Sequence, residues 1–256
     1  MSIYEEALEL HNELQGKLDV VSRVSVKNEK MLSLAYSPGV AEPCRRICDD
    51  ISKTFELTGK GNMIAVVSDG SAVLGLGNIG AEAALPVMEG KCVLFKAFGG
   101  VNAVPICLST QNPDEIVKIV KSLEPNFGGI NLEDIAAPAC FVIEKRLKEE
   151  TKMAIFHDDQ HGTAVVIIAA LINALRFIGK KADEVKVVIN GAGAAGTSIV
   201  KMLIDLGLQE IIVCDRAGIL YDGRLGLNPF KKELAAITNK KGLQGGLTEA
   251  IAGADI

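Results

Sequence analysis

Two short acidic segments, GGINLEDI and MAIFHDD, contain residues that could carry chemistry. Each is an apolar run that ends in two adjacent acids, Glu133-Asp134 in the first and Asp158-Asp159 in the second. We expect both runs to be strands of a parallel sheet, whose carboxyl ends line the ligand crevice in α/β proteins. Four carboxylates gathered there would repel one another unless a cation lay among them. Because hard oxygen ligands suit Mg²⁺ or Mn²⁺, the pattern indicates a divalent-metal site.

The same stretch allows two other interpretations. His157 and His161 are four residues apart, which resembles zinc-ligand spacing, but the first reads as strand and the second as a helix start. Alternatively, Asp158 or Asp159 is the N-cap of a long apolar helix predicted over 161–178, and the remaining acids are solvated.

Two further residues are candidates for proton transfer. Lys91 precedes the apolar run CVLF, which we expect to be a strand near 92–95. It is either an ordinary surface lysine or, near a cation and an apolar strand, a general base with a lowered pKa. Tyr36 opens YSPGV and is either an ordinary turn residue or a proton donor to an enolate.

A glycine motif in the second half of the chain predicts a dinucleotide site. GAGAAG follows the branched strand VKVVIN and opens a helix, and the next strand, EIIVC, leads to an acid 24 residues after the first glycine. The glycines permit a tight turn, close approach of a pyrophosphate and close helix packing, and the helix N-terminus favours negative charge. The predicted cofactor-binding residues are Gly191, Ala192, Gly193, Ala194, Ala195, Gly196 and Asp215.

Asp215 favours NAD, because a carboxylate accepts a hydrogen bond from a ribose 2′-hydroxyl and repels a 2′-phosphate. The adjacent Arg216 could pair with that phosphate, so NADP stays possible. A second match to the glycine pattern, at 75–80, lacks a suitably placed acid. We interpret that match as loop geometry or chance.

The alternation of predicted strands and helices indicates an α/β fold with largely parallel sheets. We expect an N-terminal α/β substrate domain over residues 1–160, followed by a doubly wound, Rossmann-type NAD(P)-binding domain over 161–256. The helix at 161–178 joins the two and is expected to be buried on most sides. The final residues, GADI, look like the opening of a further strand, so we expect the sequence to stop inside its second domain.

Composition argues against several classes of partner. The net charge of −5 gives no footprint for nucleic acid or an anionic membrane. The most apolar run, TAVVIIAALINAL, is shorter than the ~20 residues that span a bilayer. The six cysteines are scattered without a C-x-x-C pair, which suggests buried free thiols in a reducing compartment. We therefore expect a cytoplasmic protein without nucleic-acid or membrane partners.

Six segments, in this order along the chain, resemble the malic enzyme family in its short bacterial form: YSPGVAEPC, VVSDGSAVLGLGNIG, EGKCVLFKAFGG, INLEDIAAPACF, FHDDQHGTA and VVINGAGAAG. The resemblance implies oxidative decarboxylation of L-malate to pyruvate and CO₂, with reduction of NAD or NADP and with Mg²⁺ or Mn²⁺. By position it implies that Tyr36 is the general acid, that Lys91 is the general base, that Glu133, Asp134 and Asp159 bind the metal, and that Asp158 holds the lysine or a metal-bound water.

The resemblance also implies a homodimer or a higher homo-oligomer. The apolar helix predicted over 3–14 is a candidate interface, although we expect it to pack on its own domain. Two other functions stay open. One is a metal-independent NAD(P) dehydrogenase acting on another small acid. The other is a non-catalytic nucleotide-binding fragment.

Overall fold

The computed structural model describes residues 2–256, which divide into two compact units. The first comprises residues up to Ile135 together with Ile143–Phe156, and the second comprises Ala136–Val142 together with His157–Ile256. The division at residue 160 into a substrate and a nucleotide domain stays a prediction, because compactness alone does not define what each part binds.

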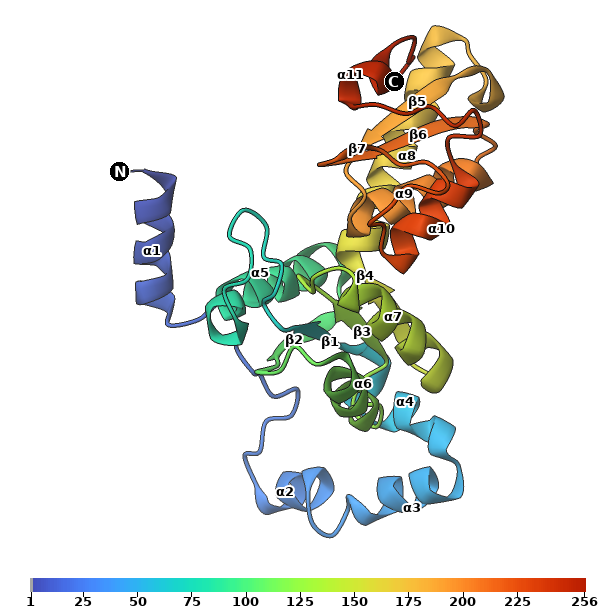
Figure 1. Ribbon diagram of the computed structural model, residues 1–256. Helices are drawn as coiled ribbons and strands as arrows, with labels where there is room; N and C mark the ends of the chain where they lie inside the picture. Colours follow the sequence, from blue (N-terminus) through green and yellow to red (C-terminus); the bar gives the residue numbers. More distant parts are fainter. Residues whose placement is uncertain (1) are drawn as a thin grey trace. The chain divides into compact units, whose positions relative to one another are not determined.

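A four-stranded sheet forms the centre of the first unit (Figure 1). Its order is β2-β1-β3-β4, and β1 runs parallel to both β2 and β3. Every residue of β3 is buried, as expected for a strand covered on both faces. The strands are β1 (Met63–Ser68), β2 (Asn102–Cys107), β3 (Gly129–Leu132) and β4 (Ala154–His157).

Helix α5 (Ala81–Gly99) corrects the sequence-based prediction around Lys91. We predicted a strand near 92–95, which is wrong, because one continuous helix covers the whole segment. Its buried residues follow helical spacing, and two of them pack with Val66 of β1. The branched and aromatic run CVLF favoured a strand, but the repeat of small and apolar residues over three turns decides the structure. Those buried residues are Ala81, Ala84, Met88 and Cys92.

Helices α6 (Pro113–Ser122) and α7 (Ala139–Glu150) follow β2 and β3 along the chain. The side chain of Asn112 caps α6 by accepting a hydrogen bond from the amide of Asp114 at 2.9 Å, and Pro113 occupies the first helical position.

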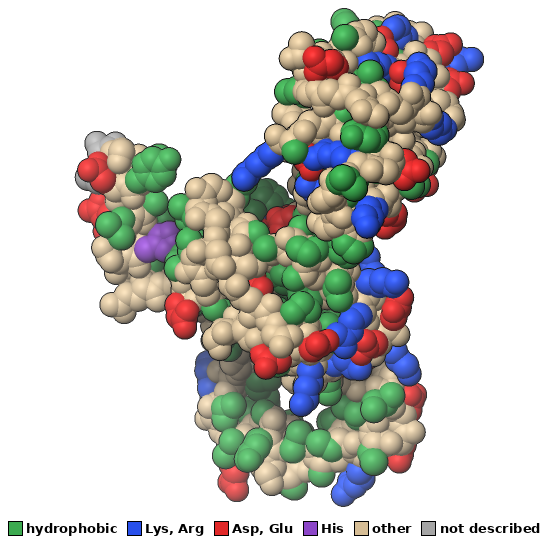
Figure 2. Space-filling view, viewed as in Figure 1, with side chains coloured by type: hydrophobic (Ala, Val, Ile, Leu, Met, Phe, Trp, Pro, Cys, Tyr) green, Lys and Arg blue, Asp and Glu red, His purple; other side chains and the backbone are tan. Residues whose placement is uncertain are grey.

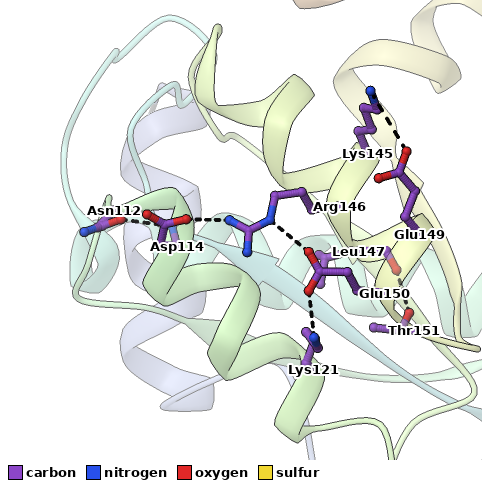
Figure 3. A network of polar contacts seen from close by, with 9 residues as sticks. All are labelled: Asn112, Asp114, Lys121, Lys145, Arg146, Leu147, Glu149, Glu150 and Thr151. Carbon is purple, nitrogen blue, oxygen red and sulfur yellow. Dashed lines mark hydrogen bonds and ion pairs between the residues drawn. The ribbon is translucent and has the colours of Figure 1, made fainter.

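A network of surface charges connects α6 to α7 (Figure 3). Arg146 of α7 donates to Asp114 at 2.5 Å and to Glu150 at 3.0 Å, and Lys121 of α6 donates to Glu150 at 2.6 Å. Hydrogen bonds from Lys121 and Arg146 lower the pKa of Glu150. Because these groups face water, their ion pairs contribute little to the free energy of unfolding. Their role is to connect α6 with α7.

The four N-terminal helices contain no buried residue among those described. Helix α1 (Ile3–Leu14) forms as predicted, with a Ser2/Glu5 capping box, but the expectation that it packs on its own domain is wrong. Apolar side chains lie on the surface over α1, α2 (Glu29–Ala35) and α3 (Ala41–Asp49) in Figure 2. Helix α4 (Thr54–Leu57) completes the set.

The cysteines of α3 depart from expectation as well. Cys44 and Cys48 are exposed, whereas buried thiols were predicted. Burial does raise the pKa of Cys92 in α5 to about 12.

Short 3₁₀ turns lie at Ile51–Lys53, Gly59–Asn62 and Ala182–Glu184.

The second unit has a three-stranded sheet of order β5-β6-β7. Strands β5 (Lys186–Asn190) and β6 (Glu210–Asp215) are parallel, and β7 (Gly218–Ile219) is antiparallel to β6. The amide of Val188 in β5 donates to the carbonyl of Ile256 at 2.9 Å, so the last residues pair with β5 as a strand would. The helices are α8 (Asp158–Ile178), α9 (Ala194–Asp205), α10 (Pro229–Ile237) and α11 (Leu247–Ile251). This strand–turn–helix–strand order is that of a Rossmann-type domain.

Helix α8 starts three residues earlier than predicted and is less enclosed. His157 is its N-cap, and Asp158 and Asp159 lie in its first turn, so the interpretation of either acid as the N-cap is wrong. Only one stripe of the helix is buried, and Phe177 and Ile178 are exposed, which corrects the expectation of burial on most sides. The buried stripe consists of Gln160, Ala164, Ile168, Leu171 and Leu175.

The length of α8 also changes the membrane argument. Among residues 2–256 it is the one helix with the length and apolar composition to cross a bilayer, because it extends for 21 residues rather than the thirteen of its most apolar run. Its buried stripe shares a core with Val200 and Leu203 of α9. That packing is typical of a core helix in a nucleotide-binding domain. The absence of a membrane partner stays a prediction.

Candidate functional site

The acid pair at the end of β3 lies where the chain leaves the sheet. The amide of Glu133 donates to the carbonyl of Val67 at 2.9 Å and so prolongs the pairing of β3 with β1. At Asp134 the backbone turns into the left-handed region, with φ of 54°, and its carbonyl accepts from the amide of Ala72 at 2.9 Å. Both acidic side chains are buried. Two adjacent buried carboxylates require positive charge and hydrogen-bond donors nearby.

Lys91 and Asn131 supply polar contacts to Glu133. The Lys91 ammonium lies 3.1 Å from one carboxylate oxygen, and the Asn131 amide donates to the other at 2.8 Å. The amide oxygen of Asn131 is buried and has no hydrogen-bond partner among the described residues. The predicted base and a predicted metal ligand are therefore in direct contact. Carboxylate and amide oxygens are also the donor types that Mg²⁺ and Mn²⁺ prefer.

Asp159 is the third predicted metal ligand, and it lies two residues after β4. The described residues contain a group of acids that could hold a metal ion, consisting of Glu133, Asp134 and Asp159. Neither histidine belongs to that group. His157 is buried, 3.8 Å from Asp159, and an all-oxygen donor set is not the nitrogen- or sulfur-rich set typical of zinc. Three negative charges with one lysine beside them fit a doubly charged cation.

Tyr36, the predicted acid, is exposed. It is the C-cap residue of α2, its amide donates to the carbonyl of Leu32 at 2.9 Å, and its side chain is 70% exposed. None of the hydrogen bonds found among residues 2–256 joins its hydroxyl to Lys91 or Glu133. Within this chain the structure brings Lys91 to the acids but does not bring Tyr36 to them.

The glycine turn between β5 and α9 has the geometry that the sequence predicted. Gly191 has φ of 134°, a conformation that side chains rarely adopt, and its amide donates to the carbonyl of Cys214 at 2.9 Å. A Cβ at Gly196 would lie 1.9 Å from the carbonyl oxygen of Gly191, so only glycine fits there. These two glycines are required by the backbone itself.

Gly193 is different, because neither conformation nor packing requires a glycine there. Its φ is −93°, and a Cβ would meet nothing within 4 Å. It is the N-cap of α9, and no side chain caps the helix, so the first amides of α9 are open to an incoming group. The open space and uncapped amides suit the close approach of a pyrophosphate. This fit supports a dinucleotide site at the turn.

Asp215 at the end of β6 is held by two cations that sequence reasoning missed. Arg224 donates to one carboxylate oxygen at 2.8 Å, and Lys231 donates to the other at 2.6 Å. Burial by itself would raise the pKa of Asp215, but hydrogen bonds from Lys231, Arg224 and the amide of Ala217 hold it at about 2. Arg216, the cation that the sequence suggested, is exposed. No local signal pointed to Arg224 or Lys231, because they lie in a loop and at the start of α10.

The second glycine match forms a loop, as interpreted from the sequence. Gly75 and Gly77 adopt φ near +78°, and Val73 and Gly77 form an isolated bridge that closes a tight turn. The glycines at these positions are explained by backbone conformation.

Two family models together match most of the chain. The model described as "Malic enzyme, N-terminal domain" matches residues 15–113 and 110–148, and the model described as "Malic enzyme, NAD binding domain" matches residues 160–253. The second range contains the glycine turn, and the first contains both Lys91 and the acid pair.

Individual relatives agree with the family models. The chain is 60% identical over its full length to a bifunctional malic/malolactic enzyme of Bacillus subtilis, covering 63% of that protein. It is 54% identical to an NAD-dependent malic enzyme of Geobacillus stearothermophilus, over 94% of this chain and 50% of that one. The crystal structure of an NAD-dependent malic enzyme from Thermotoga maritima matches with a TM-score of 0.95 at 55% identity, over 97% of this chain and 67% of that one. The chain thus spans between half and two thirds of the length of these relatives.

Proposed function

Because the chain belongs to the malic enzyme family, we propose that the protein carrying this sequence converts L-malate to pyruvate and CO₂ while reducing NAD or NADP. The observation that carries the proposal is the contact between Lys91 and Glu133 beside the buried carboxylate of Asp134. A lysine next to a cluster of buried acids combines a proton acceptor with a set of metal ligands. A plain nucleotide-binding module would need neither.

Glu133, Asp134 and Asp159 would hold a divalent cation, Mg²⁺ or Mn²⁺. Bound there, such an ion supplies Lewis-acid polarisation of the substrate oxygen and stabilises negative charge on it. Asp158 follows β4 directly and lies in the first turn of α8, where we propose that it orients the lysine or a water of the site.

Lys91 is the proposed base that accepts the proton of the malate hydroxyl while hydride leaves for the nicotinamide. In the structure its ammonium is paired with Glu133 at 3.1 Å. With a cation held by Glu133, that pairing would be weaker, and Lys91 in its neutral amine form would accept the hydroxyl proton. The helix α5 positions it rigidly, because Cys92 next to it is buried against β1.

Tyr36 is the proposed acid that protonates the enolate carbon. A proton donor works best where water is excluded, and at 70% exposure Tyr36 needs a cover that this chain does not itself provide. The apolar residues Ile3, Leu8 and Leu14 of α1 are also exposed, which supports the same need for a covering surface. We therefore propose a homodimer or higher homo-oligomer in which a second copy covers the N-terminal helices.

The oligomer is tested by light scattering on the eluted protein. Leu8→Lys should shift the mass towards the monomer and reduce turnover together, while the matched change Leu225→Lys, at an exposed leucine of the second unit, should do neither. A wild-type protein that is monomeric at micromolar concentration would overturn this part of the proposal.

NAD or NADP is the proposed oxidant, held at the turn of Gly191, Gly193 and Gly196. We also propose a cytoplasmic location without nucleic-acid or membrane partners. The cysteines among the described residues form no disulfide, which fits a reducing compartment. Cell fractionation tests the location.

The deciding experiment combines an activity assay with a binding assay. The protein carrying this sequence is given L-malate, either NAD⁺ or NADP⁺, and Mn²⁺, and reduced nicotinamide, pyruvate and CO₂ are measured together. Excess EDTA should abolish all three products. Asp134→Asn should weaken Mn²⁺ binding, followed by electron paramagnetic resonance, while Asp114→Asn, at an exposed acid, should leave it unchanged.

Other outcomes identify the alternatives. Oxidation that ignores EDTA would favour a metal-independent dehydrogenase of another small acid. Binding of NADH without any turnover of malate, and without Mn²⁺ binding, would favour a non-catalytic nucleotide-binding module.

A further inference from the structure

The N-terminal arm, residues 2–28, contacts the helix that carries Lys91 through a short turn. Gln15 is the C-cap of α1 with φ of 52°, and Gly16 follows with φ of 123°, a conformation that side chains rarely adopt. Among the described residues 12–28, Gly16 and Lys17 are half-buried and the others are exposed. The arm is therefore anchored at this turn.

Lys17 makes two hydrogen bonds to α5. Its ammonium donates to the carbonyl of Pro86 at 2.6 Å, and its amide donates to the carboxylate of Glu89 at 3.1 Å. A Cβ at Gly90 would lie 3.5 Å from the Lys17 ammonium, so that ammonium lies directly beside the glycine. Lys17 thus spans the helical turn that ends one residue before Lys91.

Two residues weaken this turn of α5. Pro86 has no amide, so the helix lacks one of its backbone hydrogen bonds, and Gly90 is a poor helix former because its backbone is the freest in the unfolded chain. The buried side chains of Met88 and Cys92 hold the inner face of the helix against β1. On the outer face, Lys17 supplies two contacts exactly where the helix is weakened.

The position of Lys91 depends on the shape of this turn. Its ammonium lies 3.1 Å from a carboxylate oxygen of Glu133, and its Cα belongs to the residue that follows Gly90. A change in the direction of the helix at Gly90 would move the lysine away from the acids. Misplacing a reacting group by about 1 Å can cost about a hundredfold in rate.

We propose that Lys17 is a positioning residue for Lys91. It clamps the turn from Pro86 to Gly90 from the outer face and so holds the Lys91 ammonium where it meets the acids. Lys17 itself does not touch the reacting atoms. The inference rests on the proposed function, because it takes Lys91 as the base, whereas the clamp can be measured without any turnover.

The clamp is tested by hydrogen exchange in the 256-residue chain, followed by mass spectrometry. Lys17→Met keeps the side-chain stem and removes the ammonium. Exchange of the amides at 87–92 should then become roughly tenfold faster, as expected for the loss of a hydrogen bond from a charged group. Lys60→Met is the matched control, because the Lys60 ammonium also donates to a backbone carbonyl, that of Glu124, at 2.7 Å. It should leave exchange at 87–92 unchanged.

The effect on Lys91 is tested by turnover of the protein carrying this sequence with L-malate, NAD⁺ or NADP⁺, and Mn²⁺. Lys17→Met should lower kcat by roughly tenfold or more and change the KM for malate and the Mn²⁺ affinity by less than about twofold. Deuterium at C2 of malate should slow this variant more than the wild type, because the step that Lys91 assists becomes rate-limiting. Lys60→Met should change none of these quantities.

Three further variants connect the effect to the turn. Lys17→Arg keeps the cation and should retain most of the kcat. Pro86→Ala returns an amide to the helix, so in the Lys17→Met background it should restore kcat and slow the exchange again. Glu89→Met removes the acceptor of the Lys17 amide and should act in the same direction as Lys17→Met.

The outcomes separate this inference from the proposed function. If Lys17→Met does not speed exchange, if it leaves kcat unchanged, or if Pro86→Ala restores neither, the role of Lys17 is overturned while the proposed function stands. A lower oligomer mass by light scattering, parallel to the fall in kcat, would also overturn it, because the arm would then act through assembly. If the wild type does not turn over malate, the proposed function fails, and the effect on exchange alone decides whether the clamp exists. If Lys17→Met does not fold, the response of Glu89→Met decides.

Discussion

Replacing Gly196 by alanine should damage both the stability and the nucleotide site of the second unit. The new Cβ would lie 1.9 Å from the carbonyl oxygen of Gly191 and 3.0 Å from its carbonyl carbon. Because these are backbone atoms, they must move by roughly 1 Å to reach even a short contact, and close-packed interiors resist such a shift. Overpacking of this kind costs about 1–3 kcal/mol.

The displaced atoms belong to the turn that would hold the pyrophosphate. Gly191 is also tied to β6 through its hydrogen bond to Cys214, so the shift should strain that contact as well. We expect the urea midpoint, followed by circular dichroism, to fall by about 1 M at an m-value of about 2 kcal/mol/M. NADH affinity should fall at least about tenfold in the same sample.

Gly193→Ala is the matched control, because a Cβ there meets nothing and φ is −93°. It should leave the urea midpoint unchanged and still weaken NADH, since the methyl group would occupy the space that the pyrophosphate needs. Unchanged NADH binding in Gly193→Ala would refute the assignment of this turn to a ligand. An unchanged midpoint in Gly196→Ala would refute the packing argument.

Three other predictions follow from the ion pairs. Lys91→Met should abolish malate turnover yet keep or raise Mn²⁺ affinity, since Glu133 loses a competing cation, and retained turnover would contradict the role of Lys91 as base. The pKa of Asp215 is about 2 in the folded chain against an ordinary 3.8, so its stabilisation of about 2 kcal/mol is present above pH 4 and is lost as the pH falls towards 2. Urea unfolding at a series of acidic pH values should show that loss in the wild type and not in Asp215→Asn. Arg146→Met should leave the urea midpoint nearly unchanged, because its contacts with Glu150 lie at the surface, and a clear fall of the midpoint in urea titrations would contradict that assignment.

Most helices and strands were predictable because local signals agree with tertiary packing. The helix at α6 follows from its Asn-Pro cap and apolar spacing, and β5, the glycine turn and α9 follow from their order along the chain. The segment around Lys91 was mispredicted because CVLF has strand-like residues. Whether such a run forms a helix or a strand depends on the residues that it packs against. Here Met88 and Cys92 lie on one face of α5 and pack against Val66 of β1.

The acids of the site were predictable for a related reason. Glu133 and Asp134 follow a fully buried strand, and a charged pair at that point has to lie at the carboxyl edge of a sheet. No sequence pattern predicted the contact between Lys91 and Glu133, because the two residues are more than forty positions apart in the chain. The exposure of Tyr36 was not predictable either, because no pattern in YSPGV distinguishes an exposed turn residue from a buried one.

The choice between NAD and NADP could not be predicted from residues that are adjacent in sequence. From the sequence, Asp215 argues for NAD and its neighbour Arg216 argues for NADP, and the two arguments cannot be weighed. In the folded chain Arg216 is exposed, and the cations that contact Asp215 come from nine and sixteen residues further on. If a dinucleotide places its 2′-substituent at Asp215, that substituent would therefore meet charges from the β7 turn and the start of α10. A carboxylate after the second strand predicts NAD preference only where no such cations neutralise it, and this chain supplies two.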